Sequence, residues 1–331
     1  MRRIHWGILS TARINDKFIA GCARSDSVTI SAVASRDLER AEVYADEHGI
    51  ERAHGSYEEL LADPGVEAVY ISLPNSMHLE WTERALRAGK HVLCEKPLGR
   101  RASEVAAAFD LAEREDRLLM EAFMYRHNPQ TRRLTELVGA GAVGRLQMIR
   151  AAFSFNVADE ANVRLASDLG GGALMDVGCY CVSAARLLAG EPREVTGQQV
   201  LGGDGVDVAF TGTMLLSDGV LAHFDAGLAL PARAELEVVG DQGSLFLDDP
   251  WHCLAPVIEV RHGNRERVEL PPVDSYMLEA ENLSAAICGE SEPLLGRSDA
   301  VGQASAIEAL YTAAGGSAAL ENKPRVVSGV E

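Results

Sequence analysis

Residues 4–15 read Ile4-His5-Trp6-Gly7-Ile8-Leu9-Ser10-Thr11-Ala12-Arg13-Ile14-Asn15, and this stretch decides the fold. A short apolar strand ends at Leu9, and a turn of small residues then opens a helix. A dinucleotide-binding site of the Rossmann type places a G-x-G-x-x-G turn at this point. If positions 10, 12 and 15 correspond to the glycines, Ser, Ala and Asn replace all three, although small residues at 10 and 12 still let backbone N–H groups approach a pyrophosphate. A purely structural strand-to-helix turn would carry the same residues, so this stretch alone leaves both interpretations open.

The first half of the chain alternates short β-branched runs with helical patterns, which is typical of a parallel sheet built from βαβ units. We expect strands at residues 4–9, 29–35, 68–73, 91–95 and 118–123, and helices at 16–23, 38–48, 77–88 and 103–114. These patterns predict an α/β domain of the Rossmann fold over residues 1–124.

After residue 125 the pattern becomes rich in strands. A helix is expected after Pro129, another at 172–189 and a last one at 298–319, with strands at 147–155, 194–200, 207–216, 219–227, 234–239, 243–247, 257–262 and 266–270. We predict an α+β domain over residues 125–331, built on a large, mostly antiparallel sheet with one open face. The last helix is a candidate to pack back on the first domain, and the open face favours a homodimer or homotetramer.

Composition limits the class of protein. The 331 residues suggest two domains, and 47% hydrophobic with 24% charged residues is ordinary for a globular protein. A net charge of −18 argues against nucleic acid as a partner, and the apolar runs are too short for a membrane span. The six cysteines form no CxxC pair, which indicates buried thiols in the cytoplasm, and the nine histidines form no metal-binding pattern.

The end of the second expected strand reads Ala34-Ser35-Arg36-Asp37-Leu38-Glu39-Arg40. An NAD site would place an acid there to hold the ribose hydroxyls, whereas an arginine suits a 2′-phosphate. The neutral Ser35, followed by Arg36 and Arg40, favours NADP(H) over NAD(H). The alternative is a set of surface residues in which Asp37 caps the next helix.

Two further stretches carry groups that can exchange protons. In Gly170-Gly171-Gly172-Ala173-Leu174-Met175-Asp176-Val177-Gly178-Cys179-Tyr180, a helix would put Asp176 and Tyr180 on the same face. In Cys94-Glu95-Lys96-Pro97, a lysine follows a strand at the sheet edge where chemistry collects in parallel sheets. For the first stretch the alternative is that Asp176 caps a turn and Tyr180 only packs. For the second stretch it is that Lys96 lies on the surface in an ion pair with Glu95.

These motifs occur together, and the whole chain resembles the Gfo/Idh/MocA oxidoreductases. The resemblance rests on the opening strand and turn, and on Ala34-Ser35-Arg36-Asp37, Glu95-Lys96-Pro97, Glu121-Ala122-Phe123-Met124-Tyr125-Arg126, residues 170–180 and Gly240-Asp241-Gln242-Gly243-Ser244-Leu245. Tyr180 stands where the family usually has histidine. That departure resembles the subgroup of dimeric dihydrodiol dehydrogenases, NADP-dependent xylose dehydrogenases and glucose–fructose oxidoreductase.

The resemblance implies Tyr180 as proton donor or acceptor, Asp176 as the residue that orients the substrate, and Lys96 as a cationic partner. The ammonium group and an oxidised nicotinamide ring would lower the pKa of the phenol from about 10. The residues implied for cofactor binding are Ser10, Thr11, Ala12, Arg13, Ile14, Ser35, Arg36, Arg40, Leu73, Pro74, Asn75, His78, Glu95, Lys96 and Arg126. Those expected to line the substrate pocket are Tyr125, Phe153, Tyr276 and Trp251, and the alternative for the last three is packing in the hydrophobic core.

The expected function is hydride transfer between NADP(H) and a small-molecule substrate that is a sugar, a diol or a carbonyl compound. One alternative is a regulator that senses NAD(P) without catalysis. Another is an enzyme that holds NADP tightly and oxidises one sugar while it reduces another. For Arg126 the alternative to cofactor binding is an ion pair between domains. For His78 the alternative is an ordinary residue in the first turn of a helix.

Overall fold

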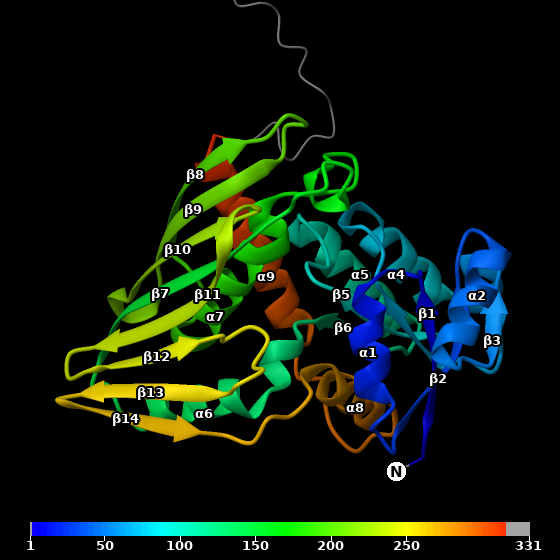
Figure 1. Ribbon diagram of the computed structural model, residues 1–331, viewed down its shortest axis with the longest axis horizontal. Helices are drawn as coiled ribbons and strands as arrows, with labels where there is room; N and C mark the ends of the chain where they lie inside the picture. The colour runs from blue at the N-terminus through cyan, green and yellow to red at the C-terminus, as the bar shows by residue number, and fades with distance from the viewer. Residues whose placement is uncertain (1, 316–331) are drawn as a thin grey trace, which may run out of the picture.

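The computed structural model describes residues 2–315 and contains two β-sheets that lie side by side (Figure 1). Residues 316–331 lie outside the described residues, and they include the predicted end of the last helix at 316–319 and the last part of the second predicted domain. Within the described part no helix is long and apolar enough to cross a membrane.

The first sheet has six parallel strands in the order β3-β2-β1-β4-β5-β6. The strands are β1 (Ile4–Leu9), β2 (Val28–Ala34), β3 (Arg52–His54), β4 (Ala68–Ile71), β5 (His91–Glu95) and β6 (Leu119–Ala122), and the helices between them are α1 (Ile14–Cys22), α2 (Leu38–His48), α3 (Tyr57–Ala62), α4 (His78–Arg87) and α5 (Ala102–Arg114). The strand order reverses between β1 and β4, which is where sheets of this type leave a crevice for a ligand. This is the predicted Rossmann fold.

Two elements of this α/β region, one strand and one helix, were not predicted from the sequence. β3 has three residues and α3 has six, so neither is long enough to show a periodic pattern. Ser56 caps α3 by accepting a hydrogen bond from the Glu59 N–H, at 3.1 Å. The cap helps this short helix to form beside a three-residue edge strand.

The second sheet has eight strands in the order β14-β13-β12-β11-β7-β10-β9-β8, as predicted mostly antiparallel. Its strands are β7 (Leu146–Asn156), β8 (Glu194–Leu201), β9 (Asp207–Leu215), β10 (Leu221–Gly227), β11 (Ala229–Gly240), β12 (Ser244–Asp248), β13 (Val257–His262) and β14 (Asn264–Glu269). Only β7 and β10 run parallel to each other.

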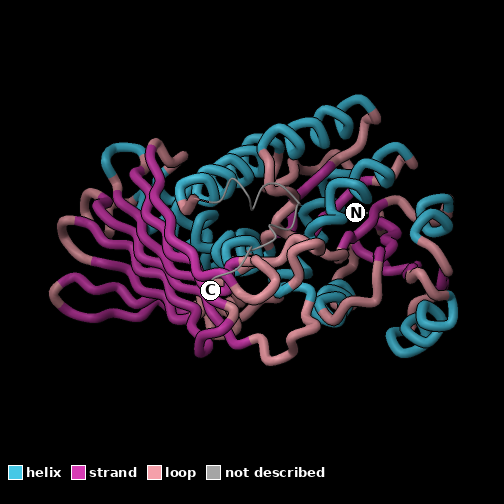
Figure 2. The backbone as a smooth tube through the Cα atoms, turned by 90° about the horizontal axis from the view of Figure 1, so that it is seen from above, coloured by secondary structure: helices cyan, strands magenta, loops and turns pink. Residues whose placement is uncertain are grey.

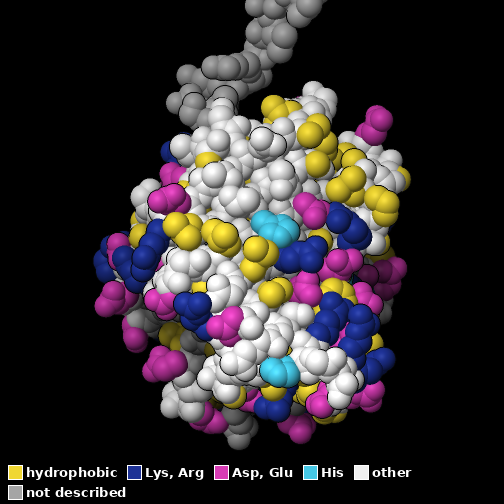
Figure 3. Space-filling model, turned by 90° about the vertical axis from the view of Figure 1, so that its left-hand side faces the viewer, with side chains coloured by type: hydrophobic (Ala, Val, Ile, Leu, Met, Phe, Trp, Pro, Cys, Tyr) yellow, Lys and Arg dark blue, Asp and Glu magenta, His cyan; other side chains and the backbone are white. Residues whose placement is uncertain are grey.

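One face of the second sheet is covered by helices and the other is open (Figure 2). The covering helices are α6 (Pro129–Gly139), α7 (Cys179–Ala189) and α9 (Arg297–Ala313). On the open face, hydrophobic side chains lie among charged groups of both signs (Figure 3). Exposed members of this face include Val200 and Leu221, which are 61% and 49% exposed.

Helices from the end of the chain return to the first sheet. α8 (Ser275–Ile287), which the sequence did not predict, contacts α1 and β5, while α9 contacts α5. The indole Nε1 of Trp6 in β1 donates to Ser284 Oγ of α8 at 3.2 Å. No residue of α8 is exposed, and three of its five buried residues (Ser275, Glu279 and Ser284) are polar, so the sequence lacks the apolar stripe of a surface helix.

Candidate active site

A cavity of about 510 Å³ runs from the start of α1 to the covered face of the second sheet. The carboxyl ends of β1, β4 and β5 form one wall, and residues after β7, the start of the Tyr180 helix and α8 form the other. Both halves of the chain therefore contribute to one site. The lining residues used below are Ala12, Arg13, Ile14, Lys17, Leu73, Pro74, Asn75, His78, Glu95, Lys96, Met124, Phe153, Phe155, Asp159, Asn162, Val163, Arg164, Asp176, Tyr180, His252 and Tyr276.

The turn after β1 replaces glycines with side chains that hydrogen-bond. Ser10 has φ +130°, a conformation that favours glycine, and its Oγ lies 2.8 Å from Ser72 Oγ and accepts from the Ala12 N–H at 3.1 Å. Asn15 donates from Nδ2 to the Ser10 carbonyl at 2.9 Å. Ser10 and Asn15 are buried behind the turn, while Ala12 lines the cavity.

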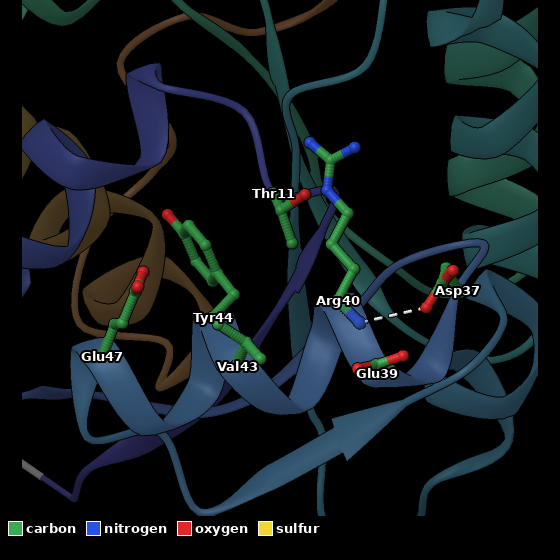
Figure 4. A pocket seen from close by; sticks show the side chains of 7 residues that line it. All are labelled: Thr11, Asp37, Glu39, Arg40, Val43, Tyr44 and Glu47. Carbon is green, nitrogen blue, oxygen red and sulfur yellow. Dashed lines mark hydrogen bonds between the residues drawn. The ribbon is translucent and has the colours of Figure 1, made fainter.

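Helix α2 and its N-cap form a separate pocket beside this turn. Arg40 extends from α2 past Thr11, and the two residues line the pocket together with Asp37, Glu39, Val43, Tyr44 and Glu47 (Figure 4). Asp37 caps α2 by accepting from the Arg40 N–H at 3.0 Å. Ser35 is buried and Arg36 is exposed.

The residues after β4 connect the cavity to the loop before the Tyr180 helix. Asn75 donates from Nδ2 to the Gly170 carbonyl at 2.9 Å. The ring nitrogens of the buried His78 lie 2.8 Å from the Leu73 carbonyl and 2.9 Å from the Pro97 carbonyl. Burial lowers the pKa of His78. His78 therefore joins two loops that carry cavity residues, and it lines the cavity together with Leu73, Pro74 and Asn75.

Lys96 and Asp176 form the central ion pair of the cavity. Lys96 Nζ donates to the Asp176 backbone carbonyl at 2.8 Å and to Oδ1 at 3.3 Å, and Arg164 Nε donates to Oδ2 at 2.7 Å. Burial opposes ionisation of Asp176, but the two cations outweigh it and lower the pKa of the carboxyl group. Burial also opposes the charge on Lys96, and Asp176 outweighs it, so the pKa of the ammonium group is raised.

Tyr180 lies beside this ion pair in an aromatic setting. Lys96 Nζ is 5.1 Å from the centre of the phenol ring, and the hydroxyl donates to Met124 Sδ at 3.6 Å. Burial, followed by the charge of Glu95, raises the pKa of Tyr180 well above its ordinary value. Lys96 does not produce the expected decrease in this pKa, because Asp176 neutralises the ammonium charge and carboxylates surround the phenol.

Glu95 lines the cavity next to Lys96 and is fixed by two contacts. Tyr70 donates its hydroxyl to Oε1 at 2.6 Å, and the Lys96 N–H donates to Oε2 at 3.2 Å. Burial raises the pKa of this carboxyl group despite the neighbouring lysine. The alternative of an exposed Lys96–Glu95 pair does not describe this arrangement, in which the Lys96 side chain binds Asp176.

Comparison with known proteins gives the family. Residues 4–123 match "Oxidoreductase family, NAD-binding Rossmann fold", and residues 131–246 match "GFO/IDH/MocA C-terminal domain". The chain is 40% identical to "D-xylose 1-dehydrogenase (NADP(+)) 2" of Haloferax volcanii over 96% of this chain and 99% of that one. The chain belongs to the Gfo/Idh/MocA family of oxidoreductases.

A second relative and a solved structure extend this comparison. "Trans-1,2-dihydrobenzene-1,2-diol dehydrogenase" of Xenopus tropicalis is 31% identical, over 80% of this chain and 81% of that one. The structure of KijD10, a 3-ketoreductase from Actinomadura kijaniata with NADP and TDP-benzene, has a TM-score of 0.89 at 29% identity and covers 94% of this chain and 98% of that one. The names of the two relatives confirm the subgroup predicted from Tyr180.

In this family member, the helix that carries Asp176 and Tyr180 begins with a π-helical turn, Leu174–Gly178, instead of the predicted α-helix from residue 172. Turns of this kind often occur at functional sites. Asp207 Oδ2 accepts from the Leu174 N–H at 2.7 Å, and Tyr311 donates its hydroxyl to Asp207 Oδ1 at 2.8 Å. Gly172 has φ +128°, and a Cβ there would lie 2.2 Å from that oxygen. A buried carboxylate thus holds the start of the Tyr180 helix.

Some residues expected at the site lie elsewhere. The Arg126 guanidinium binds Asp299 Oδ1 at 3.2 Å and does not line the cavity. Both residues lie in the second predicted domain, so this ion pair is not the one between domains that was the alternative. Tyr125 is buried behind Tyr180 and donates to Ser183 Oγ at 2.8 Å. Trp251 is also fully buried. In contrast, Phe153 and Tyr276 line the cavity.

The sequence analysis did not single out several residues of the site. Arg164 and His252 line the cavity from segments without a regular pattern, and Asp207 begins an ordinary strand. Only the three consecutive glycines at 170–172 indicated that another group must approach this backbone closely. Nothing in the sequence identified that group as Asp207.

The burial of Asp207 predicts a pH effect on stability. Burial raises the pKa of Asp207 to about 6, against about 3.9 in an unfolded chain. The folded carboxyl keeps its proton where the unfolded one has lost it, so its contribution to the free energy of unfolding falls as the pH rises from about 4 to about 6. We expect Asp207→Asn to lack this decrease, so that its stability relative to the wild type improves by roughly 2 to 3 kcal/mol between pH 4 and pH 7.

Urea unfolding of both proteins at several pH values measures this difference. A difference that does not vary with pH would contradict the assignment of the titration to Asp207.

Proposed function

We propose that this protein is an NADP(H)-dependent oxidoreductase that acts on a sugar, a diol or a small carbonyl compound, with Tyr180 as the residue that exchanges the proton. The observation that carries this proposal is one cavity with a dinucleotide-type turn at one end and Lys96, Asp176 and Tyr180 at the other. A protein that only senses a cofactor has no need of a proton donor at that place.

The residues present fit a nicotinamide dinucleotide. The N-terminus of α1 carries a partial positive charge that suits a pyrophosphate, its N-cap residue Arg13 makes no side-chain cap hydrogen bond, and Arg13 and Lys17 line the cavity beside it. Leu73, Pro74 and Asn75 line the path from this turn to Lys96. When bound, the cofactor would supply or accept the hydride.

The proposed preference for NADP(H) rests on the pocket beside the turn. Arg40 and Thr11 lie where the ribose of the adenosine would reach, and Ser35 occupies the place of the acid of an NAD site. A planar guanidinium binds a phosphate with two hydrogen bonds, so Arg40 suits a 2′-phosphate. The xylose dehydrogenase relative and the KijD10 structure carry NADP in their names.

The charges of Lys96 and Asp176, and the raised pKa of Tyr180, suggest a role for each of these three residues. Tyr180 is a neutral phenol before ligands bind, so it can donate its proton to a carbonyl oxygen during reduction. Lys96 lies against the same ring and would stabilise the negative charge that then develops. Asp176 holds the ammonium group through two hydrogen bonds and offers its carboxylate to a substrate hydroxyl. In the oxidation direction the same proton returns to Tyr180.

The KijD10 structures add support. They include variants in which one lysine is replaced by alanine and one tyrosine by phenylalanine. Those two residues are separated by as many positions as Lys96 and Tyr180 are in this chain.

Substitution of Tyr180 tests the proton transfer. We expect Tyr180→Phe to reduce kcat by about 10²- to 10⁴-fold, because the aromatic packing remains but the proton donor is lost. NADPH binding, measured by fluorescence titration, should be unchanged. Tyr125→Phe is the matched control, since its hydroxyl binds Ser183 outside the cavity and its loss should leave kcat close to that of the wild type.

The assay follows NADPH absorbance with a panel of aldoses, diols and dicarbonyl compounds. Full activity of Tyr180→Phe would refute the assignment of this residue. If the wild type turns over none of these substrates, the alternative of a regulator that senses NAD(P) without catalysis is favoured. A protein that copurifies with nicotinamide absorbance and transfers hydride between two sugars would identify the tightly bound alternative.

Substitution of Arg40 tests the cofactor preference. We expect Arg40→Ala to raise KM for NADP by about 10- to 100-fold, because a charge-assisted contact with the 2′-phosphate is lost, and to leave KM for NAD unchanged. Arg145→Ala removes an arginine whose side chain is 80% exposed on the second domain, and it controls for loss of charge alone. Equal effects on both cofactors would contradict the proposed role.

We also propose that the open face of the second sheet is the contact surface of a homodimer or homotetramer. Large exposed side chains such as Val200 and Leu221 lie there without a covering helix. We expect Leu221→Glu to shift the protein towards monomers in light scattering after size-exclusion chromatography. Leu294→Glu, a similarly exposed leucine outside the sheet, should not change the mass. A monomeric wild type would refute this assembly.

A cytoplasmic location is part of the proposal. All six cysteines lie in the described residues and are free thiols, and five of them are buried. Free thiols in apolar surroundings are typical of a reducing compartment.

A further inference from the structure

A loop between β12 and β13 brings His252 to the substrate end of the cavity. Trp251, its neighbour, is fully buried and donates from Nε1 to the Ala152 carbonyl at 3.1 Å, which anchors the loop to β7. Two residues of this loop that are not glycine, Asp249 and Cys253, have φ of +119° and +55°. Such conformations cost energy and are kept where the surroundings require them, often at ligand sites.

Asp249 orients the His252 ring. Its Oδ1 accepts from the His252 N–H at 2.9 Å and lies 3.1 Å from Nδ1, while Oδ2 accepts from the Leu254 N–H at 3.2 Å. A carboxylate at Nδ1 requires a proton on that nitrogen, so in the neutral ring Nε2 is an acceptor. Within the described residues Nε2 has no hydrogen-bond partner, and the ring lines the cavity.

His252 lies one aromatic ring away from the proposed proton donor. Its ring meets the Phe153 ring edge-on, with centres 5.5 Å apart, and Phe153 in turn meets Tyr180 with centres 5.3 Å apart. A substrate whose reacting carbon is beside Tyr180 would therefore meet His252 at a different, more distant carbon.

The rest of this end of the cavity is amphipathic. Phe153, Phe155 and Tyr276 provide apolar surface, and Asp159, Asn162 and Arg164 provide polar groups. Arg164 is fixed by Asp176 and lies 5.8 Å from the centre of the Phe155 ring. This combination suits a molecule with an apolar ring face and several hydroxyl groups at its edge.

We propose that His252 is a specificity-determining residue whose Nε2 accepts a hydrogen bond from a hydroxyl group of a polyhydroxylated substrate, at a carbon remote from the one that reacts. The inference rests on the proposed oxidoreductase function and narrows its substrate class to sugars. An apolar diol without that hydroxyl would not make this hydrogen bond, and the loss of such a contact lowers kcat/KM relative to the sugar.

The test compares D-xylose and D-glucose with derivatives that lack one hydroxyl at a time. With the wild type we expect one deoxy derivative to have a kcat/KM about tenfold or more below that of its parent sugar. In His252→Leu the parent sugar should fall to the level of that derivative, and the two substrates should no longer be distinguished. His252→Gln, which retains an acceptor, should restore part of the discrimination.

His262→Leu provides the matched control, since His262 is exposed at the end of β13 and outside the cavity. It should behave like the wild type with every sugar. Asp249→Asn should weaken the same discrimination, because the ring loses the carboxylate that orients it.

The outcomes separate the two proposals. If the wild type turns over sugars and His252→Leu keeps the wild-type pattern, or lowers kcat/KM equally for all substrates, the role of His252 is refuted while the proposed function stands. If the wild type turns over only diols without further hydroxyls, the sugar assignment is refuted. If it turns over nothing with either cofactor, the proposed function itself fails.

Discussion

The ion pair between Lys96 and Asp176 connects the two halves of this molecule at the place where the chemistry is proposed. Lys96 follows a strand of the first sheet, and Asp176 lies in the helix that covers the second. Their side chains are only 12% and 13% exposed. Such a pair is costly unless other polar contacts complete it, and the Asp176 carbonyl and Arg164 do so here. Because Asp176 neutralises Lys96, the Tyr180 ring lies beside an ammonium group whose charge is already balanced.

Several contacts around this pair keep its geometry fixed. Asp207 holds the first turn of the Tyr180 helix and is itself held by Tyr311 from α9. Asn75 binds the Gly170 carbonyl from the first sheet, and His78 joins the loop after β4 to the loop that carries Lys96. Groups from both sheets and from the last described helix thus converge on one short helical turn.

Much of the fold was predictable because it depends on local patterns. The alternation of strands and helices before residue 124 predicted the parallel sheet, and the later strands predicted the antiparallel one. α8 escaped prediction because three of its five buried residues are polar, which removes the periodic apolar signal. The predicted Lys96, Asp176 and Tyr180 do come together in one cavity, whereas Arg126 and Tyr125 do not line it. Met124, Tyr125 and Arg126 lie in one short 3₁₀-helix (Met124–His127), and of these three only Met124 lines the cavity. Sequence spacing alone did not separate them.

By itself the sequence determined the class of fold, the residue types available for proton exchange and the substitution of tyrosine for the usual histidine. These features depend on neighbours in the chain or on the identity of single residues. Only the tertiary structure decided the surroundings that raise the pKa of Tyr180, the anchoring of its helix by Asp207 and the presence of Arg164 and His252 in the cavity. Burial and the distance between charges determine those properties, and both arise from segments that are far apart in the chain and meet only in the folded protein.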